Sequence, residues 1–316
     1  MRHHSFWIIL IAAGLSSCLN AQQPDNKKPM YGEVPKNKHY KKIDEDFKKR
    51  VLVQFGSIDS AVQVHIDFAW NYFYNNDLET AMKRFNQAWL LNSEFPDSYF
   101  GFAALMDMQN NNTQSARFYK IGNEKDITKE RAKICYQRVA DCKEQLQDFK
   151  GTIEAYTKLT EINPNNAFAF KKIGYFQSNF GNTKEALTAY TKAIELDPTD
   201  ATTYNNRGYL FQTLYRTEEN YKNAIADYTK AIELDSKYIS AYVNRGITFM
   251  ENKDFVAAKR DFEICVQLDS SSGELRRILG LSKLSLNDKS GACGDFKLAK
   301  ELGDLQANDL LKQNCQ

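Results

Sequence analysis

Histidine is scarce in this sequence, which contains only four: His3, His4, His39 and His65. Metal centres and activated nucleophiles usually need histidine close to cysteine, carboxylate or hydroxyl groups. No histidine follows His65, so such a cluster cannot form in the greater part of the chain. A glycine-rich phosphate-binding loop is also missing. We therefore expect no catalytic activity, no metal and no cofactor.

Neither sign of charge dominates, because 42 lysine and arginine residues face 40 aspartate and glutamate residues and leave a net charge of +2. Domains that bind nucleic acids usually concentrate basic residues. The balance predicts a solvated surface of mixed charge and no nucleic-acid partner.

Long apolar runs are missing, apart from the stretch from Phe6 to Leu15 near the start of the chain. This run follows a short basic segment and is too short for a permanent membrane-spanning helix. It is typical of an export signal, and we assign residues 1–18 to that signal.

The signal ends in Leu15-Ser16-Ser17-Cys18, which resembles a bacterial lipobox. The resemblance implies that the Cys18 thiol is acylated and that Cys18 becomes the new amino terminus. Ordinary secretory cleavage after Ala21 is the alternative. Leu19 differs from the aspartate that keeps some lipoproteins at the inner membrane. We therefore expect a lipid anchor in the outer membrane of a bacterial cell envelope, with a periplasmic or secreted protein as the alternative.

Residues 19–60 are polar and rich in lysine, and they contain three of the six prolines. The composition predicts a solvated basic tether, although contact of its lysines with anionic lipid head groups is an alternative. A short helix from Asp44 to Gln54 is expected to cap the first folded repeat.

The stretch from Ala167 to Asp200 is the clearest structural unit of the sequence. Apolar and small residues fall at helical spacing over Ala167–Phe180 and again over Thr183–Leu196. Gly181-Asn182 separates the two segments, and Asp197-Pro198 ends the second, because proline cannot continue a helix. The unit is therefore predicted to be a helical hairpin.

The pattern of this unit recurs through most of the chain. Its eighth position is always small: Ala69, Ala103, Ala140, Gly174, Gly208, Gly246 and Gly280. Its twenty-fourth position is always aromatic: Phe85, Tyr119, Tyr156, Tyr190, Tyr228, Phe262 and Phe296. Such a period predicts stacked hairpins in which small residues make room for rings.

Together with Ala186, Ala193 and Pro198 in the clearest unit, this pattern resembles the tetratricopeptide repeat (TPR) family. The resemblance implies an all-α fold, a right-handed superhelical solenoid over residues 61–316 that forms one elongated domain. We count seven repeats and a capping helix: 62–95, 96–129, 133–166, 167–200, 201–238, 239–272, 273–306 and the cap 305–316. Gly122 and Asn123 are expected to interrupt the second helix of repeat 96–129, and four extra residues in repeat 201–238 are expected to form a protruding loop.

The six cysteines fall into distinct groups. Cys135 and Cys142 lie seven residues apart on one predicted helix, about 10 Å between α-carbons, which is too far for a disulfide. Cys265 occupies a small-residue position and is expected to be packed. Cys293 and Cys315 are candidates for a disulfide that fastens the tail onto the last repeat, because exported proteins meet oxidising conditions.

The first two repeats are dense in aromatic residues. We expect Phe68, Tyr72 and Phe85 in the core, because they occupy packing positions of the repeat. Residues outside those positions are expected to pack between repeats, with an exposed patch as the alternative: Trp70, Tyr74, Trp89 and Phe100. An exposed patch of this kind would suit glycan binding.

In TPR proteins the first helices line a concave groove that holds partner peptides, and the resemblance implies such a groove here. The residues at the matching positions are aromatic, aliphatic and amide-bearing: Phe168, Lys171, Tyr175, Asn179, Asn205, Asn206, Tyr209, Gln212, Ile247 and Met250. These side chains suit a peptide whose backbone meets the amides while rings hold its apolar residues. We expect a scaffold that binds a protein or peptide partner.

Some TPR proteins hold chaperone tails with a clamp of lysine, asparagine and arginine residues. Lys171 and Asn206 match that clamp, but Tyr175, Ser240 and Asn244 do not, so chaperone-tail binding is not expected. The alternatives are an accessory role in an envelope hydrolase or glycan uptake complex, and direct glycan binding through Trp70, Tyr74 and Trp89.

Overall fold

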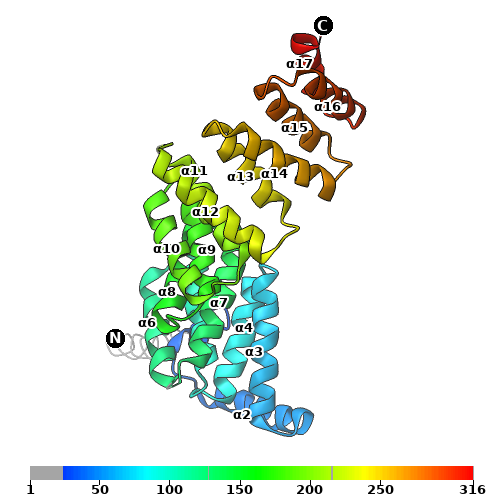
Figure 1. Cartoon of the computed structure of the whole chain (residues 1–316). Coiled ribbons are helices and arrows are strands. Elements are labelled where there is room, and N and C mark those ends of the chain that lie inside the picture. Colours follow the sequence, from blue (N-terminus) through cyan, green and yellow to red (C-terminus); the bar gives the residue numbers. More distant parts are fainter. Residues whose placement is uncertain (1–23, 127, 215, 316) are drawn as a thin grey trace, which may run out of the picture. The chain divides into compact units, whose positions relative to one another are not determined.

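The computed structural model describes residues 24–126, 128–214 and 216–315, and within these ranges the chain is helical and has no strand (Figure 1). The elements are η1 (Pro29–Glu33), α2 (Lys38–Phe55), α3 (Ile58–Tyr74), α4 (Leu78–Leu91), α5 (Pro96–Met108), α6 (Asn112–Lys125), α7 (Glu130–Gln145), α8 (Phe149–Ile162), α9 (Ala167–Asn179), α10 (Thr183–Leu196), α11 (Ala201–Thr213), α12 (Glu218–Leu234), α13 (Ile239–Glu251), α14 (Phe255–Leu268), α15 (Gly273–Ser285), α16 (Lys289–Glu301) and α17 (Ala307–Asn314). The predicted all-α fold class is confirmed.

Contacts group the chain into two compact units, one ending at Asp148 and one beginning at Phe149. The boundary divides the predicted repeat 133–166, whereas the sequence pattern suggests one continuous domain. In a solenoid each helix contacts mainly its near neighbours. A repeat pattern that is continuous in the sequence can therefore fold into more than one compact unit.

Short loops join the paired helices in a recurring way. In α3–α4 and α15–α16, an asparagine with positive φ, Asn76 (59°) or Asn287 (63°), precedes an aspartate that caps the next helix. Asp77 and Asp288 each accept a hydrogen bond from a backbone amide in the first turn. Asparagine tolerates the left-handed conformation and aspartate is a favoured N-cap, so sequence chemistry sets these turns.

Rings packed on glycines hold the helix pairs of the second unit together. A Cβ atom added to Gly174 would lie 2.7 Å from the Tyr190 ring, and one added to Gly246 would lie 2.5 Å from the Phe262 ring. Both rings are fully buried. The small residue therefore lets the two helices of a pair approach to ring contact.

Buried ion pairs connect neighbouring helix pairs. Arg245 Nε and Nη2 each donate to the Asp261 carboxylate over 2.8 Å, and Arg245 Nη1 donates to Thr229 of the preceding pair over 2.9 Å. Arg207 repeats this arrangement with Asp227 and Thr191. Each arginine thus joins three helices.

Two local expectations from the sequence are wrong. Helix α6 continues through Gly122 and Asn123, because Gly122 packs against the Phe100 ring, which a Cβ atom would approach to 2.6 Å. The four extra residues near Arg216 mostly lengthen α12, which has 17 residues where α10 has 14, so the insertion extends a helix more than it forms a loop.

The prediction of a solvated tether is also wrong over residues 24–57, because this segment packs on the other helices of the first unit. Asn86 of α4 is fully buried beneath it, donates to the carbonyl oxygens of Asn26 and Lys28, and accepts from the Tyr31 amide. Glu33 forms an ion pair with Arg117. The segment is polar because it satisfies polar groups of α4, and a polar composition alone does not reveal that role.

The helix expected to cap the first repeat is longer than predicted. It was predicted from Asp44 to Gln54, whereas helix α2 spans Lys38–Phe55 and contacts α3. Asn37 begins the helix by accepting from the Tyr40 amide, and Gly56 ends it with φ of 75°. Asparagine as N-cap and glycine as C-cap therefore define a helix that lacks strong apolar periodicity in its first turn.

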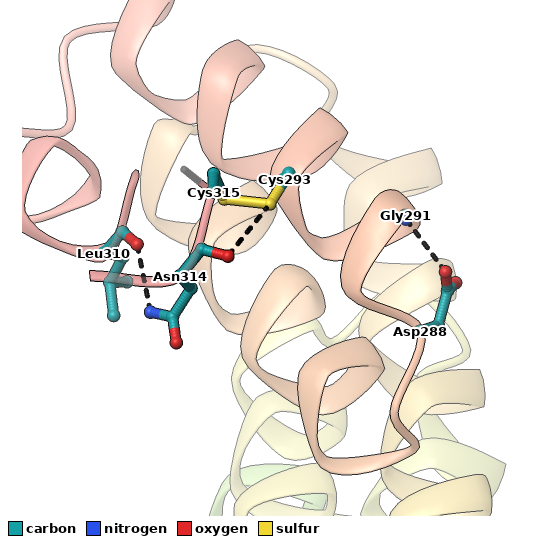
Figure 2. Close-up of a disulfide and its surroundings, with 6 residues drawn as sticks. All are labelled: Asp288, Gly291, Cys293, Leu310, Asn314 and Cys315. Carbon is teal, nitrogen blue, oxygen red and sulfur yellow. Dashed lines mark hydrogen bonds between the residues drawn. A yellow bond between two sulfur atoms is a disulfide. The ribbon is translucent and has the colours of Figure 1, made fainter. Parts of the chain in front are cut away.

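At the carboxyl end, α17 packs on α16, and Cys293 and Cys315 form a disulfide (Figure 2). Asp304 holds the start of α17, because one carboxylate oxygen accepts from the Ala307 amide and the other accepts from Arg277 Nε at 2.8 Å. Burial raises the pKa of Asp304, but the Arg277 guanidinium and the backbone amides of Ala307 and Gln306 together outweigh that effect and leave the pKa below its usual range.

His65 on α3 is 5% exposed, and within the described residues neither ring nitrogen has a hydrogen-bond partner. The rings of Phe47 and Phe55 from α2 lie 5.8 and 6.3 Å away between centroids. Burial, reinforced by Arg84, lowers the pKa of His65 to about 4. His65 is therefore neutral in the folded protein at neutral pH.

We predict that Gly246→Ala destabilises the protein by about 1–3 kcal/mol, because the added methyl overpacks against Phe262. Gly294→Ala on α16 is the matched control, since nothing lies within 4 Å of its added Cβ atom. That change should be neutral or stabilise by up to about 1 kcal/mol through helix propensity. Urea unfolding followed by circular dichroism measures both, and equal effects would contradict the packing described above.

We predict that the first unit loses stability as the pH falls from 6.5 towards 4. The unfolded His65 takes up a proton near pH 6.5, whereas the folded pKa is about 4, so stability is fully present above pH 6.5. The loss should reach about 3 kcal/mol at its limit. His65→Leu should remove this slope, and His39→Gln on the exposed side of α2 should keep it. Fluorescence of Trp70 and Trp89 reports the unfolding, and parallel wild-type and His65→Leu profiles would refute the prediction.

Candidate partner-binding surface

Large apolar side chains lie exposed on the first helices of the second unit. Tyr175 of α9, Tyr209 of α11 and Ile247 of α13 occupy the same position of successive repeats and are 47%, 51% and 37% exposed. Phe168 of α9 is 44% exposed. Helix α11 contacts both α9 and α13, so these residues lie on adjacent helices. We call Phe168, Tyr175, Tyr209 and Ile247 the first-helix stripe.

Repeat geometry explains the exposure. Gly174 packs inward on Tyr190, and Tyr175 is the next residue, about 100° further around the helix. Gly208 and Tyr209 are related in the same way, as are Gly246 and Ile247. The contact that buries one position therefore turns the following side chain outward.

Two predicted site residues are buried and hold the helices together. Gln212 is 8% exposed, accepts from the Tyr228 hydroxyl over 2.9 Å and donates to Glu251 over 3.3 Å. Asn205 is 7% exposed and accepts from Asn244 over 3.0 Å. These amides link α11 to α13, so they position the stripe and are not open to a partner.

The other predicted polar residues differ in availability. Asn206 bonds with Tyr190, whose pKa is raised by burial. Asn179 is exposed at the end of α9. Lys171 forms an ion pair with Asp200 at 2.8 Å. Burial raises the pKa of Asp200, but the Lys171 ammonium and the hydrogen bonds from Thr203 and Thr202 together leave that pKa below its usual range. The charge of Lys171 is thus already neutralised within the chain.

Met250 belongs to the packing of α13, because it lies against the buried cluster that contains Tyr242 and Phe262. It is partly buried, and its contribution to the surface is smaller than that of Ile247. Of the ten predicted groove residues, four form the exposed first-helix stripe, Asn179 is also exposed, and the other five are partly or fully buried and form a supporting layer.

The aromatic residues of the first unit pack together, as favoured from the sequence. Trp70 is 3% exposed and its ring lies 5.3 Å from that of Phe85, while Phe100 is fully buried. Trp89 Nε1 donates to the Tyr99 hydroxyl over 3.1 Å. Trp70 is therefore not available to an exposed glycan-stacking patch, whereas Tyr74 and Trp89 are partly buried.

Phe68 departs from its expected core position and is 49% exposed. The Arg84 guanidinium lies 5.8 Å from the centroid of its ring. The repeat position alone does not place this residue, because His65 and Trp70 fill the interior of α3.

A hollow of about 550 Å³ on the second unit was not anticipated from the sequence. Its lining comes from α8, α9 and α10: Thr157, Thr160, Phe170, Ile173, Lys184, Glu185, Thr188, Ala189 and Lys192. Phe170 and Ile173 of α9 contribute large apolar side chains to this lining. In the structure both are only partly buried.

No group of histidine, cysteine, aspartate and glutamate residues suitable for a metal occurs in the described part of the chain. Burial raises the pKa of the Cys142 thiol to about 11 and that of Cys265 to about 12, and it raises the pKa of Cys135 as well. These three thiols are protonated at neutral pH and therefore poor nucleophiles.

The predicted anchor, Cys18, lies outside the described residues. Over the residues that the structure does describe, no helix is both long and apolar enough to cross a bilayer.

Comparison with known proteins agrees with the repeat pattern. A TPR repeat family model matches residues 181–214 and 213–253, and a tetratricopeptide repeat model matches residues 130–166. Together the matches cover less than half of the chain and show that it contains TPR repeats. No significant match was found among curated proteins.

Solved structures with the same arrangement of helices include two of MamA. The crystal structure of MamA protein is 24% identical, covers 56% of this chain and 94% of its own, and has a TM-score of 0.51. A MamA fragment from Desulfovibrio magneticus RS-1 is 16% identical, covers 54% and 94%, and has a TM-score of 0.50. At these identities the likeness shows the fold alone, which is that of a TPR solenoid.

Proposed function

We propose that this chain is a non-catalytic scaffold of the bacterial cell envelope that binds a protein or peptide partner on the first-helix stripe. The observation that carries the proposal is the recurrence of Tyr175, Tyr209 and Ile247 as exposed side chains on three adjacent first helices. Packing within the chain does not require a large apolar residue at a position that is half exposed.

The energetics of such a stripe favour association. Covering a large apolar side chain contributes about 1.5–3 kcal/mol, and tyrosine is among the residues enriched at the energetic centres of interfaces. Tyrosine also offers a hydroxyl group to the polar backbone of a partner. An apolar peptide segment, extended or helical, therefore fits the stripe.

The paired side chains of the supporting layer indicate which kind of partner fits the stripe. Lys171 is paired with Asp200, and Gln212 is paired with Tyr228 and Glu251. A terminal carboxylate would find no unpaired cation at these positions. A partner recognised by its apolar side chains is thus favoured over an acidic chaperone tail.

The envelope location rests on the sequence of the export signal. The basic start, the apolar run and Leu15-Ser16-Ser17-Cys18 favour a lipid anchor on Cys18 in the outer membrane. An accessory role is a form of this proposal in which the partner is an envelope hydrolase or a component of a glycan uptake complex.

We predict that Tyr175→Ala combined with Tyr209→Ala weakens partner capture at least a hundredfold, because each ring should contribute about 2 kcal/mol to binding. Helix content and melting should stay unchanged, since both rings are about half exposed. The measurement is affinity capture from envelope extracts followed by a binding titration with the captured partner.

The matched control is Val256→Ala combined with Leu298→Ala, which removes exposed apolar groups from the second helices α14 and α16. This variant should capture the partner as the wild type does. If the double tyrosine variant captured the partner as well as the wild type does, the stripe would be excluded as the binding surface.

We predict that Cys18→Ala shifts the protein from the outer-membrane fraction to the soluble fraction, because the acylated thiol would be lost. Mass spectrometry of the mature amino terminus tests the chemistry directly. A wild-type protein that begins at Gln22 without lipid would contradict the anchor and support secretory cleavage instead.

A further inference from the structure

Helix α2 carries a concentration of cationic side chains. Six basic residues are exposed on it, and none of them forms an ion pair within the described part of the chain: Lys38, Lys41, Lys42, Lys48, Lys49 and Arg50. The aspartate that faces inward, Asp44, is paired with Lys36 at 2.6 Å. Three acidic residues of α2, Asp44, Glu45 and Asp46, offset part of this charge, and the helix keeps an excess of three cations.

One face of α2 packs against the other helices of the first unit. Val51 is 4% exposed, and Phe47 lies against His65. Tyr40, Phe47 and Leu90 of α4 share the lining of a cleft of about 310 Å³ between the two helices. These residues fix which side of α2 points inward.

The opposite face combines cationic and apolar groups. Lys38, Lys42, Lys49 and Val53 are spaced by four, seven and four residues, which places them on one side of a helix. Val53 is 88% exposed and the neighbouring Leu52 is 48% exposed. Glu45 and Asp46 share this side of the helix, so the three lysines exceed the acids there by one.

The position of the docked segment adds a second observation. Pro24, the first described residue, lines the same cleft as Ile43 and Phe47 of α2. Only residues 19–23 separate it from Cys18. A fully extended chain of that length spans about 20 Å. A lipid on Cys18 would therefore hold α2 close to the bilayer surface.

We infer that the outward face of α2 docks on a bilayer rich in anionic phospholipid. Lysines meet the head-group phosphates, and Val53 with Leu52 enters the interfacial region, as in interfacial amphipathic helices. Each lysine near an anionic surface should strengthen binding about fivefold. The proximity part of this inference rests on the proposed anchor, whereas the charge and exposure of α2 do not.

The test is a fluorescent label at position 53. Val53→Cys is introduced into the full-length gene, and the mature protein is purified and labelled with an environment-sensitive dye. Labelling is selective because Cys135, Cys142 and Cys265 are buried and Cys293 is bonded to Cys315. Lys222→Cys, exposed on α12 of the second unit, is the matched control.

The labelled proteins are mixed with vesicles of phosphatidylcholine containing phosphatidylglycerol and with vesicles of phosphatidylcholine alone. We expect a blue shift of the dye at position 53 on the anionic vesicles only, and none at position 222. Lys42→Glu combined with Lys49→Glu should weaken that response at least twentyfold, following two losses of about fivefold each.

Absence of a shift on anionic vesicles would overturn the inference. So would equal shifts on both kinds of vesicle, which would indicate proximity through the anchor alone, or a shift that depends on protein concentration without vesicles, which would assign the face to a second copy. Cys18→Ala protein and mass analysis of the amino terminus separate the two proposals. An acylated protein without a shift refutes α2 docking, and an unacylated protein with a shift refutes only the anchor.

Discussion

The contact between an aromatic ring and a glycine, made by Gly174 with Tyr190 and by Gly246 with Phe262, is the constraint on which the second unit depends. It sets how closely the paired helices approach, because the ring occupies the space that a Cβ atom would fill. The same contact fixes the rotation of each first helix. As a result the residue after the glycine, Tyr175 or Ile247, faces outward in these pairs.

Polar contacts then carry this arrangement from one pair to the next. Arg245 joins Asp261 to Thr229, and Asn244 bonds with Asn205 across adjacent first helices. Removing one partner of such a pair would lower the stability by several kcal/mol, because it leaves a buried carboxylate unpaired. The exposed stripe is thus supported by a layer whose hydrogen bonds are already made, which leaves apolar contact as the means of recognition that we propose.

The helix pairs could be predicted from the sequence because they depend on local spacing, capping residues and the glycine positions. The disulfide expected between Cys293 and Cys315 is present in the structure. Features that depend on tertiary partners could not be predicted. Gly122 resembles a helix breaker until the Phe100 ring beside it is known.

Dependence on tertiary partners also limited what could be predicted for the candidate surface and for the start of the chain. Asn205 and Gln212 occupy repeat positions expected in a groove, and only their partners reveal that they are buried. Residues 24–36 have the composition of a tether, but Asn86 of α4 gives them polar partners. Repeat position therefore identified the exposed apolar residues better than the polar ones.

A photo-crosslinking residue placed at position 209 in living cells tests the central claim most directly, with position 256 on α14 as the comparison, since Val256 is 53% exposed. The proposed scaffold predicts one dominant adduct from position 209 and none of that mass from position 256. Similar adducts from both positions, or none from either, would contradict the claim that the first-helix stripe holds a specific protein partner.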